Sequence, residues 1–370
     1  VIEMSRHRLD GLLSNLLLFG SAASLAVMAI GASLAAVSAR RIARPVEAMT
    51  RAAREIDART FDPATLDPLA AQGDELGTLA RVFRHMAIEV QRREEHLEQL
   101  VRARTAELEH KNGLLEEAAR RVEAELGAAR SLQAAMLPQI LPANPAFSGT
   151  AAMLPAREMG GDFYDFFALD DHRLGLVIAD VSGKGVPAAF FMAISRTVLQ
   201  SFARESGSPG ECLARSNDVL CAQNPMELFV TAFYGILDAQ TGLLTYANGG
   251  HNPPLAVRRG DGRVEEVPRT GGLALGVMAE VAYAERSVQL APGDTLFLYT
   301  DGISEAMDPS GHEFTEERLK ASLDGAASKS VEVVLSGVTG ALSDFVGGAP
   351  QSDDITCLVI RYLGASPSGV

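Results

Sequence analysis

The sequence predicts an α+β domain preceded by a membrane helix and a long helical linker. Residues 11–39 carry no charge over 29 positions. Residues 91–137 are rich in Glu, Arg, Leu and Ala, without proline. From residue 147 onward short apolar runs follow one another with few helical segments between them. That order favours antiparallel sheets flanked by helices over a doubly wound parallel sheet.

Length and charge limit the classes of protein to consider. A chain of 370 residues with net charge −14 should form two or three folding units. Residues 131–370 hold 15 basic and 28 acidic side chains, which would repel the phosphates of a nucleic acid. Cys212, Cys221 and Cys357 form no CxxC pair, so we expect reduced, buried thiols.

The charge-free stretch 11–39 is long enough to cross a bilayer core of about 30 Å. Arg40, Arg41 and Arg44 follow it directly, so the rest of the chain should lie in the cytoplasm, anchored by a single pass in the inner (plasma) membrane. Residues 1–10 would be a short extracytoplasmic end. Because the sequence begins with Val, we expect a truncated start, with an unusual start codon as the alternative. A buried hydrophobic helix is the alternative to a membrane span.

The stretch after the membrane helix resembles a known signalling module. Residues 41–60 predict an amphipathic helix with Pro45 in its first turn. Residues 61–73, broken by two prolines, predict a connector, and a second helix opens with the acids of DELG at Asp74. This arrangement resembles the HAMP module over residues 40–92. The resemblance implies a parallel four-helix bundle and hence a homodimer.

Residues 93–137 predict a coiled-coil linker. One heptad stripe is apolar, and its members are Val101, Leu108, Leu115, Val122, Ala129 and Met136. The partner stripe is mixed and reads Leu97, Arg104, Lys111, Ala118, Glu125 and Leu132. Polar residues in a seam reduce stability, which suits an element that shifts register. The alternative is a single charged helix lying on the following domain.

The rest of the sequence predicts short strands and several amphipathic helices. Strands are predicted at 173–179, 228–237, 243–247, 255–258, 284–290, 295–299 and 355–362. Amphipathic helices are predicted at 187–204, 209–223 and 331–345. The last residues, 364–370, are expected to form a disordered tail.

Acidic residues recur at the ends of the predicted strands. The run 174–179 ends in Asp180 and a Gly-rich turn, and Asp162 precedes it by roughly the length of a turn and a returning strand. Asp301 follows the run 295–299, and further acids open the last strand, Asp353 and Asp354. Carboxylates gathered at one edge favour a hard divalent cation.

Five motifs in order resemble one family, the PPM-type metal-dependent serine/threonine phosphatases of the SpoIIE/RsbU branch. They are GGDFYD (160–165), ADVSGKGVPAA (179–189), NGGHNPP (248–254), YTDGISEA (299–306) and SDDIT (352–356). The resemblance covers residues 147–363. It implies an αββα sandwich that holds two Mn²⁺ or Mg²⁺ ions at one edge of its paired sheets.

The resemblance also implies the roles of individual residues. Asp180 should bridge both ions with help from the Val181 carbonyl, Asp162 should hold one ion, and the other should be held by Asp301 and Asp353. Asp354 is expected beside them as a further metal ligand. The four aspartates Asp162, Asp180, Asp301 and Asp353 would act in catalysis through water activated by the ions. Ser182 stands near the place where many relatives carry a histidine, so no general acid is assigned. Arg157 and His251 are the candidates for phosphate binding and catalysis, each against a structural alternative.

The implied activity is hydrolysis of phosphoserine or phosphothreonine on a regulatory protein, an anti-sigma-factor antagonist of the STAS type. The membrane lipid and a second copy of the chain are the other expected partners. The alternative is a catalytically degenerate scaffold that binds partners through the same domain. A nucleotide cyclase is disfavoured because GGD is followed here by Phe-Tyr, where a GGDEF motif has Glu-Phe, and because of the downstream DG and SDDIT motifs.

Overall fold

The computed structural model describes residues 2–365. It divides into two compact units, Val1–Glu117 and Ala118–Val370. Apart from residues 364 and 365, the predicted tail lies outside the described residues.

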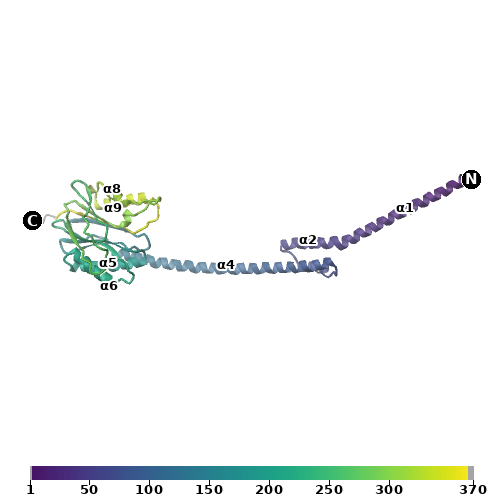
Figure 1. The fold of residues 1–370 in the computed structure, drawn as a ribbon, viewed down its shortest axis with the longest axis horizontal. Coiled ribbons are helices and arrows are strands. Elements are labelled where there is room, and N and C mark those ends of the chain that lie inside the picture. Colours follow the sequence, from purple (N-terminus) through teal and green to yellow (C-terminus); the bar gives the residue numbers. More distant parts are fainter. Residues whose placement is uncertain (1, 366–370) are drawn as a thin grey trace. The chain divides into compact units, whose positions relative to one another are not determined.

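The first unit is helical (Figure 1). It contains α1 (Ile2–Ser38), a π-helical turn η1 (Ala39–Ala43), α2 (Arg44–Asp57), η2 (Pro63–Leu66), α3 (Asp67–Ala70) and the start of α4 (Glu75–Met136). The predicted connector thus holds two short helices, and α4 begins at the predicted place. Asp74 caps α4, because its Oδ1 accepts a hydrogen bond from the Gly77 N–H at 2.9 Å.

Two features of this unit bear on its interpretation. The large apolar side chains of α1 from Leu12 onward are exposed, as on Leu16 and Phe19. The helical stretch Leu12–Asp57 is long and apolar enough to cross a membrane, as is α5 (Val186–Glu205) of the second unit, by length and composition. α5, however, buries one face against the core of its own domain, which accounts for its apolar character.

The second unit contains two five-stranded sheets whose neighbouring strands are all antiparallel. One has the order β1-β10-β9-β6-β7, built from Phe147–Leu154, Ile355–Tyr362, Thr295–Tyr299, Leu255–Val257 and Val264–Glu266. The other has the order β2-β3-β4-β5-β8, built from Phe163–Ala168, Arg173–Val181, Val230–Asp238, Leu243–Gly249 and Glu285–Gln289. The predicted strands are all present, and sequence patterns missed β1, β2 and β7.

Helices cover the outer face of each sheet. α5 and α6 (Pro209–Ala222) contact the strands of the second sheet, while α9 (Val331–Val346) contacts β1 and β10 of the first. Between α7 (Asp301–Ser304) and α9 lies α8 (Thr315–Ser322), and the labelled helix pairs lie on opposite sides of the strands (Figure 1). The main core, which includes Leu176, Phe233 and Leu358, lies between the sheets and under α5 and α6. This is the αββα sandwich that the sequence predicts.

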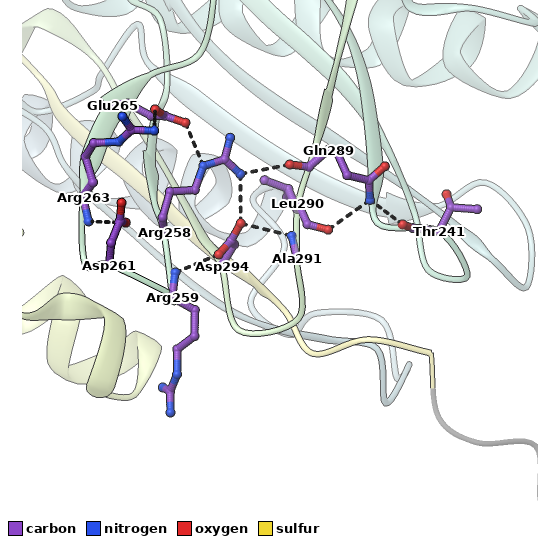
Figure 2. Close-up of polar contacts among 10 residues, drawn as sticks. All are labelled: Thr241, Arg258, Arg259, Asp261, Arg263, Glu265, Gln289, Leu290, Ala291 and Asp294. Atoms are coloured by element: carbon purple, nitrogen blue, oxygen red, sulfur yellow. Dashed lines mark hydrogen bonds and ion pairs between the residues drawn. The ribbon is translucent and has the colours of Figure 1, made fainter.

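A polar network around the buried Asp294 joins the two sheets, because Arg258 after β6 donates to the Gln289 carbonyl of β8 at 2.9 Å. Asp294 accepts hydrogen bonds from Arg258 Nη1 at 2.9 Å, from the Arg259 N–H at 2.8 Å and from the Ala291 N–H at 3.0 Å (Figure 2). Arg258 also donates to Glu265 at 2.7 Å. We call these residues the Asp294 network. Every buried charge in it faces an opposite charge or a backbone donor, as buried ions require.

Candidate metal-dependent active site

Asp162 and Asp180 lie side by side on neighbouring strands. β2 and β3 pair antiparallel with Phe163 opposite Ala179, so the same register, continued by one residue, places Asp162 opposite Asp180. The chain between them is the turn and returning strand that the spacing predicts. After burial, the charge of Asp180 is the next cause that raises the pKa of Asp162, so the two carboxyl groups lie close together.

Asp162 is the most enclosed of the acids, with 1% of its surface exposed. Thr300 Oγ1, from the opposite sheet, donates a hydrogen bond to Asp162 Oδ2 at 2.7 Å. Burial, followed by the negative charge of Asp180, raises the pKa of Asp162 well above its usual range. The site therefore lies where the two sheets meet.

Asp180 has a pKa raised to about 7, first by burial and then by the charge of Asp301, with Asp353 and Asp354 adding to it. Burial, followed by repulsion from Asp353, also raises the pKa of Asp301. Acids from four separate segments of the chain therefore lie close enough to affect one another's ionisation. We call Asp162, Asp180, Asp301 and Asp353 the acid cluster.

A lysine side chain lies at the edge of this cluster. Lys184 Nζ is 2.9 Å from Asp353 Oδ2 and donates to the Ser352 carbonyl. The lysine belongs to the SGKG turn after β3, and its side chain is 35% exposed. Sequence inspection passed over it, because its importance depends on a contact with residues near the other end of the domain.

Asp354 makes contacts of a different kind. Its Oδ1 accepts from the Ala156 N–H at 2.7 Å, and its Oδ2 accepts from the Gly161 N–H at 2.6 Å. Both oxygens therefore hold the backbone that leads into Asp162. Its role as a metal ligand stays a prediction, and positioning of this loop is the role its contacts support.

Gly302 illustrates how closely the backbone segments approach each other here. A Cβ atom added to Gly302 would lie 1.9 Å from the carbonyl oxygen of Asp354. Only glycine allows the turn after Asp301 to pass so close to the start of β10. Val181 is also close to the site, since its carbonyl oxygen would lie 2.9 Å from a Cβ on Gly161.

The other candidates from the sequence have mainly structural contacts. The His251 ring is buried between Thr231 Oγ1 at 2.8 Å and the Tyr299 carbonyl at 3.1 Å, and burial lowers its pKa to about 4. The Ser182 hydroxyl accepts from the Phe229 N–H at 2.9 Å, so it is engaged in a backbone contact. Arg157 is exposed on the loop before Gly160.

The carboxyl groups are suitable ligands for a divalent cation, but they are not yet arranged around a common position. Within residues 2–365, no three side chains of His, Cys, Asp or Glu are already arranged to hold a metal ion. Yet burial and repulsion disfavour the charged carboxylates, and Lys184 places an ammonium where positive charge is needed. Cation binding would therefore require the acids to come closer together, and it would remove their repulsion.

Comparison with protein families matches residues 170–363, just over half of the chain, to the family described as "Stage II sporulation protein E (SpoIIE)". The chain belongs to the SpoIIE family. Residues 37–92 match the HAMP domain, close to the predicted range of 40–92.

Individual relatives support membership of the SpoIIE family. Protein IcfG of Synechocystis is 30% identical over 344 residues, which cover 85% of this chain and 51% of IcfG. The chain therefore spans about half the length of that relative. The phosphoserine phosphatase RsbU of Bacillus subtilis is 27% identical, with 65% of this chain and 70% of RsbU covered.

Two solved structures have a similar fold. The RsbU and RsbW domains of Rv1364c from Mycobacterium tuberculosis match with a TM-score of 0.55 and 29% identity, covering 62% of this chain and 64% of that one. The SiaA-PP2C domain of Pseudomonas aeruginosa matches with a TM-score of 0.58 and 23% identity, covering 66% and 98%. The second likeness shows the fold.

Proposed function

We propose that this SpoIIE-family chain is a membrane-anchored phosphatase that hydrolyses phosphoserine or phosphothreonine on a regulatory protein. The observation that carries the proposal is the pairing of Asp162 with Asp180 across β2 and β3, with Asp301 and Asp353 close enough to affect their ionisation. Without cations, burial and mutual repulsion make the ionised form of these acids unfavourable. With cations bound, the same acids can form a catalytic site.

The four acids of the acid cluster would hold two Mn²⁺ or Mg²⁺ ions, with the Val181 carbonyl as a further ligand. When bound, the ions supply positive charge for the phosphoryl oxygens and lower the pKa of a water molecule. The chain's own part is to hold the carboxylates in place. Thr300 orients Asp162 through its hydroxyl, and Asp354 fixes the loop that carries Asp162.

Lys184 has a second use in this proposal. Its ammonium neutralises Asp353 at the exposed edge of the cluster, and it is long and flexible enough to turn toward a phosphate once cations occupy the acids. Ser182 and His251 are engaged in backbone and side-chain contacts, so neither is proposed as the general acid.

The finer parts of the proposal concern the substrate and the location. The named activity of RsbU supports a phosphoserine protein as substrate, and we propose an anti-sigma-factor antagonist of the STAS type. The helical stretch from Leu12 and the HAMP match support anchoring in the inner membrane, with the sandwich on the cytoplasmic side and dimerisation through the HAMP and linker helices.

The test uses residues 1–370 in detergent micelles with Mn²⁺. Phosphate release is measured from a phosphoserine peptide and from a phosphorylated STAS-domain protein, with the Asp180→Asn variant as control. The proposal predicts release that depends on Mn²⁺ and on Asp180. A chain that binds Mn²⁺ yet releases phosphate from neither substrate would favour the scaffold alternative.

A further inference from the structure

Gln133 is a buried polar residue on a largely exposed helical segment. It lies in the last turn of α4 with 5% of its surface exposed, whereas the preceding Leu132 is 70% exposed. Its side-chain amide forms two hydrogen bonds with the backbone of Gly160, which we call the amide pair. Nε2 donates to the Gly160 carbonyl at 2.6 Å, and Oε1 accepts from the Gly160 N–H at 3.2 Å. A single side chain thereby satisfies both backbone polar groups of a buried glycine.

Gly160 lies near the end of the loop that joins β1 to β2 and carries Asp162. The next residue, Gly161, is held through its N–H by Asp354. A Cβ on Gly160 would lie 2.5 Å from Met153 Cε and 2.8 Å from Asp354 Oδ2, so the loop is pressed against the sandwich. Two side chains thus fix the backbone next to Asp162, and they come from different places. Asp354 belongs to the start of β10, and Gln133 comes from the helix that leads into the domain.

Two cavities that open to the surface border the helical segment around Gln133. One, of about 430 Å³, is lined by Val122, Ala129, Met159 and Phe190 among others. The other, of about 310 Å³, is lined by Arg130, Ala151 and Tyr164 among others. Leu137, one turn further on, is buried in the main core. The amide pair with Gly160 is a specific polar contact at the point where the exposed helix meets that core.

We propose that Gln133 is a positioning residue that fixes the Gly160–Asp162 loop and so sets the affinity of the acid cluster for divalent cations. A shift of the end of α4 breaks the amide pair, frees the loop and weakens cation binding. The inference rests on the proposed function, because it assigns Gln133 to the same site. It adds a physical link between the linker helix and the acids, at one named contact.

The experiment compares Gln133→Ala and Gln133→Glu with Gln139→Ala in the chain of residues 1–370 in detergent. Gln139 is the matched control, because it is exposed and donates only two long hydrogen bonds of 3.4 Å to nearby carbonyls. Gln133→Glu keeps the side-chain size but removes the donor to the Gly160 carbonyl. Titration calorimetry with Mn²⁺ should show affinity weakened about 10- to 100-fold in both Gln133 variants. Gln139→Ala should match the parental chain.

A second readout separates positioning from general packing and needs no metal. Hydrogen exchange in the metal-free chain should rise at residues 158–163 in the Gln133 variants, while the core strands β3 and β4 keep their protection. Parental Mn²⁺ affinity with unchanged exchange at 158–163 would overturn the inference, as would exchange that rises equally over the whole domain. A parental chain that binds no Mn²⁺ would overturn the proposed function instead, and the exchange data would still decide whether Gln133 positions the loop.

Discussion

Asp294 and Asp162 are almost equally buried, with 2% and 1% of their surfaces exposed, yet their surroundings are opposite. Asp294 faces the Arg258 guanidinium and two backbone N–H groups (Figure 2). Asp162 faces one threonine hydroxyl at 2.7 Å and the carboxyl of Asp180. The same chain thus neutralises one buried acid and leaves the other among acids. The difference supports the proposal that the acid cluster holds cations.

The largest expected effect comes from substituting one acid in each of the two regions and comparing the results. Asp294→Ala leaves the donors of Arg258, Arg259 and Ala291 without their acceptor and should cost about 1–3 kcal/mol of unfolding free energy. Asp180→Asn removes a repelled carboxylate, so at pH 8 the metal-free chain should be at least as stable as the parent, while phosphate release falls to background. Denaturant unfolding and the phosphatase assay, run on both variants, check this contrast. Equal destabilisation by the two substitutions would erase the distinction between the two regions.

The next effect is the pH dependence of the metal-free chain. The pKa of Asp180 is raised to about 7 in the folded state, against about 3.9 in an unfolded chain. Between these values the folded state binds more protons, so stability falls as pH rises from about 4 to 7 and is constant above. The loss is on the order of a few kcal/mol.

Thermal melting between pH 5 and 8 in the presence of a chelator measures this slope. Asp180→Asn should flatten it. Saturating Mn²⁺ should reverse its sign, because cation binding needs ionised carboxylates and becomes stronger as pH rises. An unchanged slope in Asp180→Asn would assign the pH dependence to other groups.

A smaller effect is expected at His251. The imidazole joins Thr231 to the Tyr299 carbonyl, and its pKa of about 4 keeps it neutral at working pH. His251→Asn should cost about 1–3 kcal/mol of stability through unsatisfied buried groups. The pH profile of phosphate release between 6 and 8 should keep its shape, as in a His172→Asn control at an exposed position. Loss of one limb of that profile would show that His251 takes part in proton transfer.

The smallest effect concerns the exposed edge of the acid cluster. Lys184 competes with cations for Asp353, to which its Nζ lies at 2.9 Å, and both side chains are about one-third exposed. Exposed ion pairs contribute about 0.2–1 kcal/mol, so Lys184→Gln should tighten Mn²⁺ binding by roughly two- to fivefold. Arg173→Gln, which removes the exposed pair with Asp170, is the matched control. Weaker Mn²⁺ binding in Lys184→Gln would contradict this competition.

The sequence predicted those elements whose own pattern determines them. β3 is buried along nearly its whole length, so it appears as a continuous apolar run ending in an acid. β1 was missed because five of the eight residues of FSGTAAML are small and the strand is only partly buried. β2 was missed because its sequence FYDFFA is apolar except for Asp165 and shows no clean alternation.

The candidate site divides in the same way. The spacing of Asp162 and Asp180 predicted a turn and a returning strand, and the register of β2 and β3 agrees. Thr300 and Gln133 could not be found from local pattern. Their importance depends on hydrogen bonds to residues 138 and 27 positions away, and a polar residue in a helix or at a strand end is common. Long-range contacts of this kind come from tertiary packing.

The central claim is that the acid cluster holds cations, and direct titration of residues 1–370 with Mn²⁺ tests it most simply. The account predicts about two ions bound per chain in the parent, as in other two-metal sites, and at most one in Asp180→Asn. Asp294→Ala, measured below its melting temperature, should bind as the parent does. Equal Mn²⁺ binding by the parent and Asp180→Asn, or no binding by the parent, would contradict it.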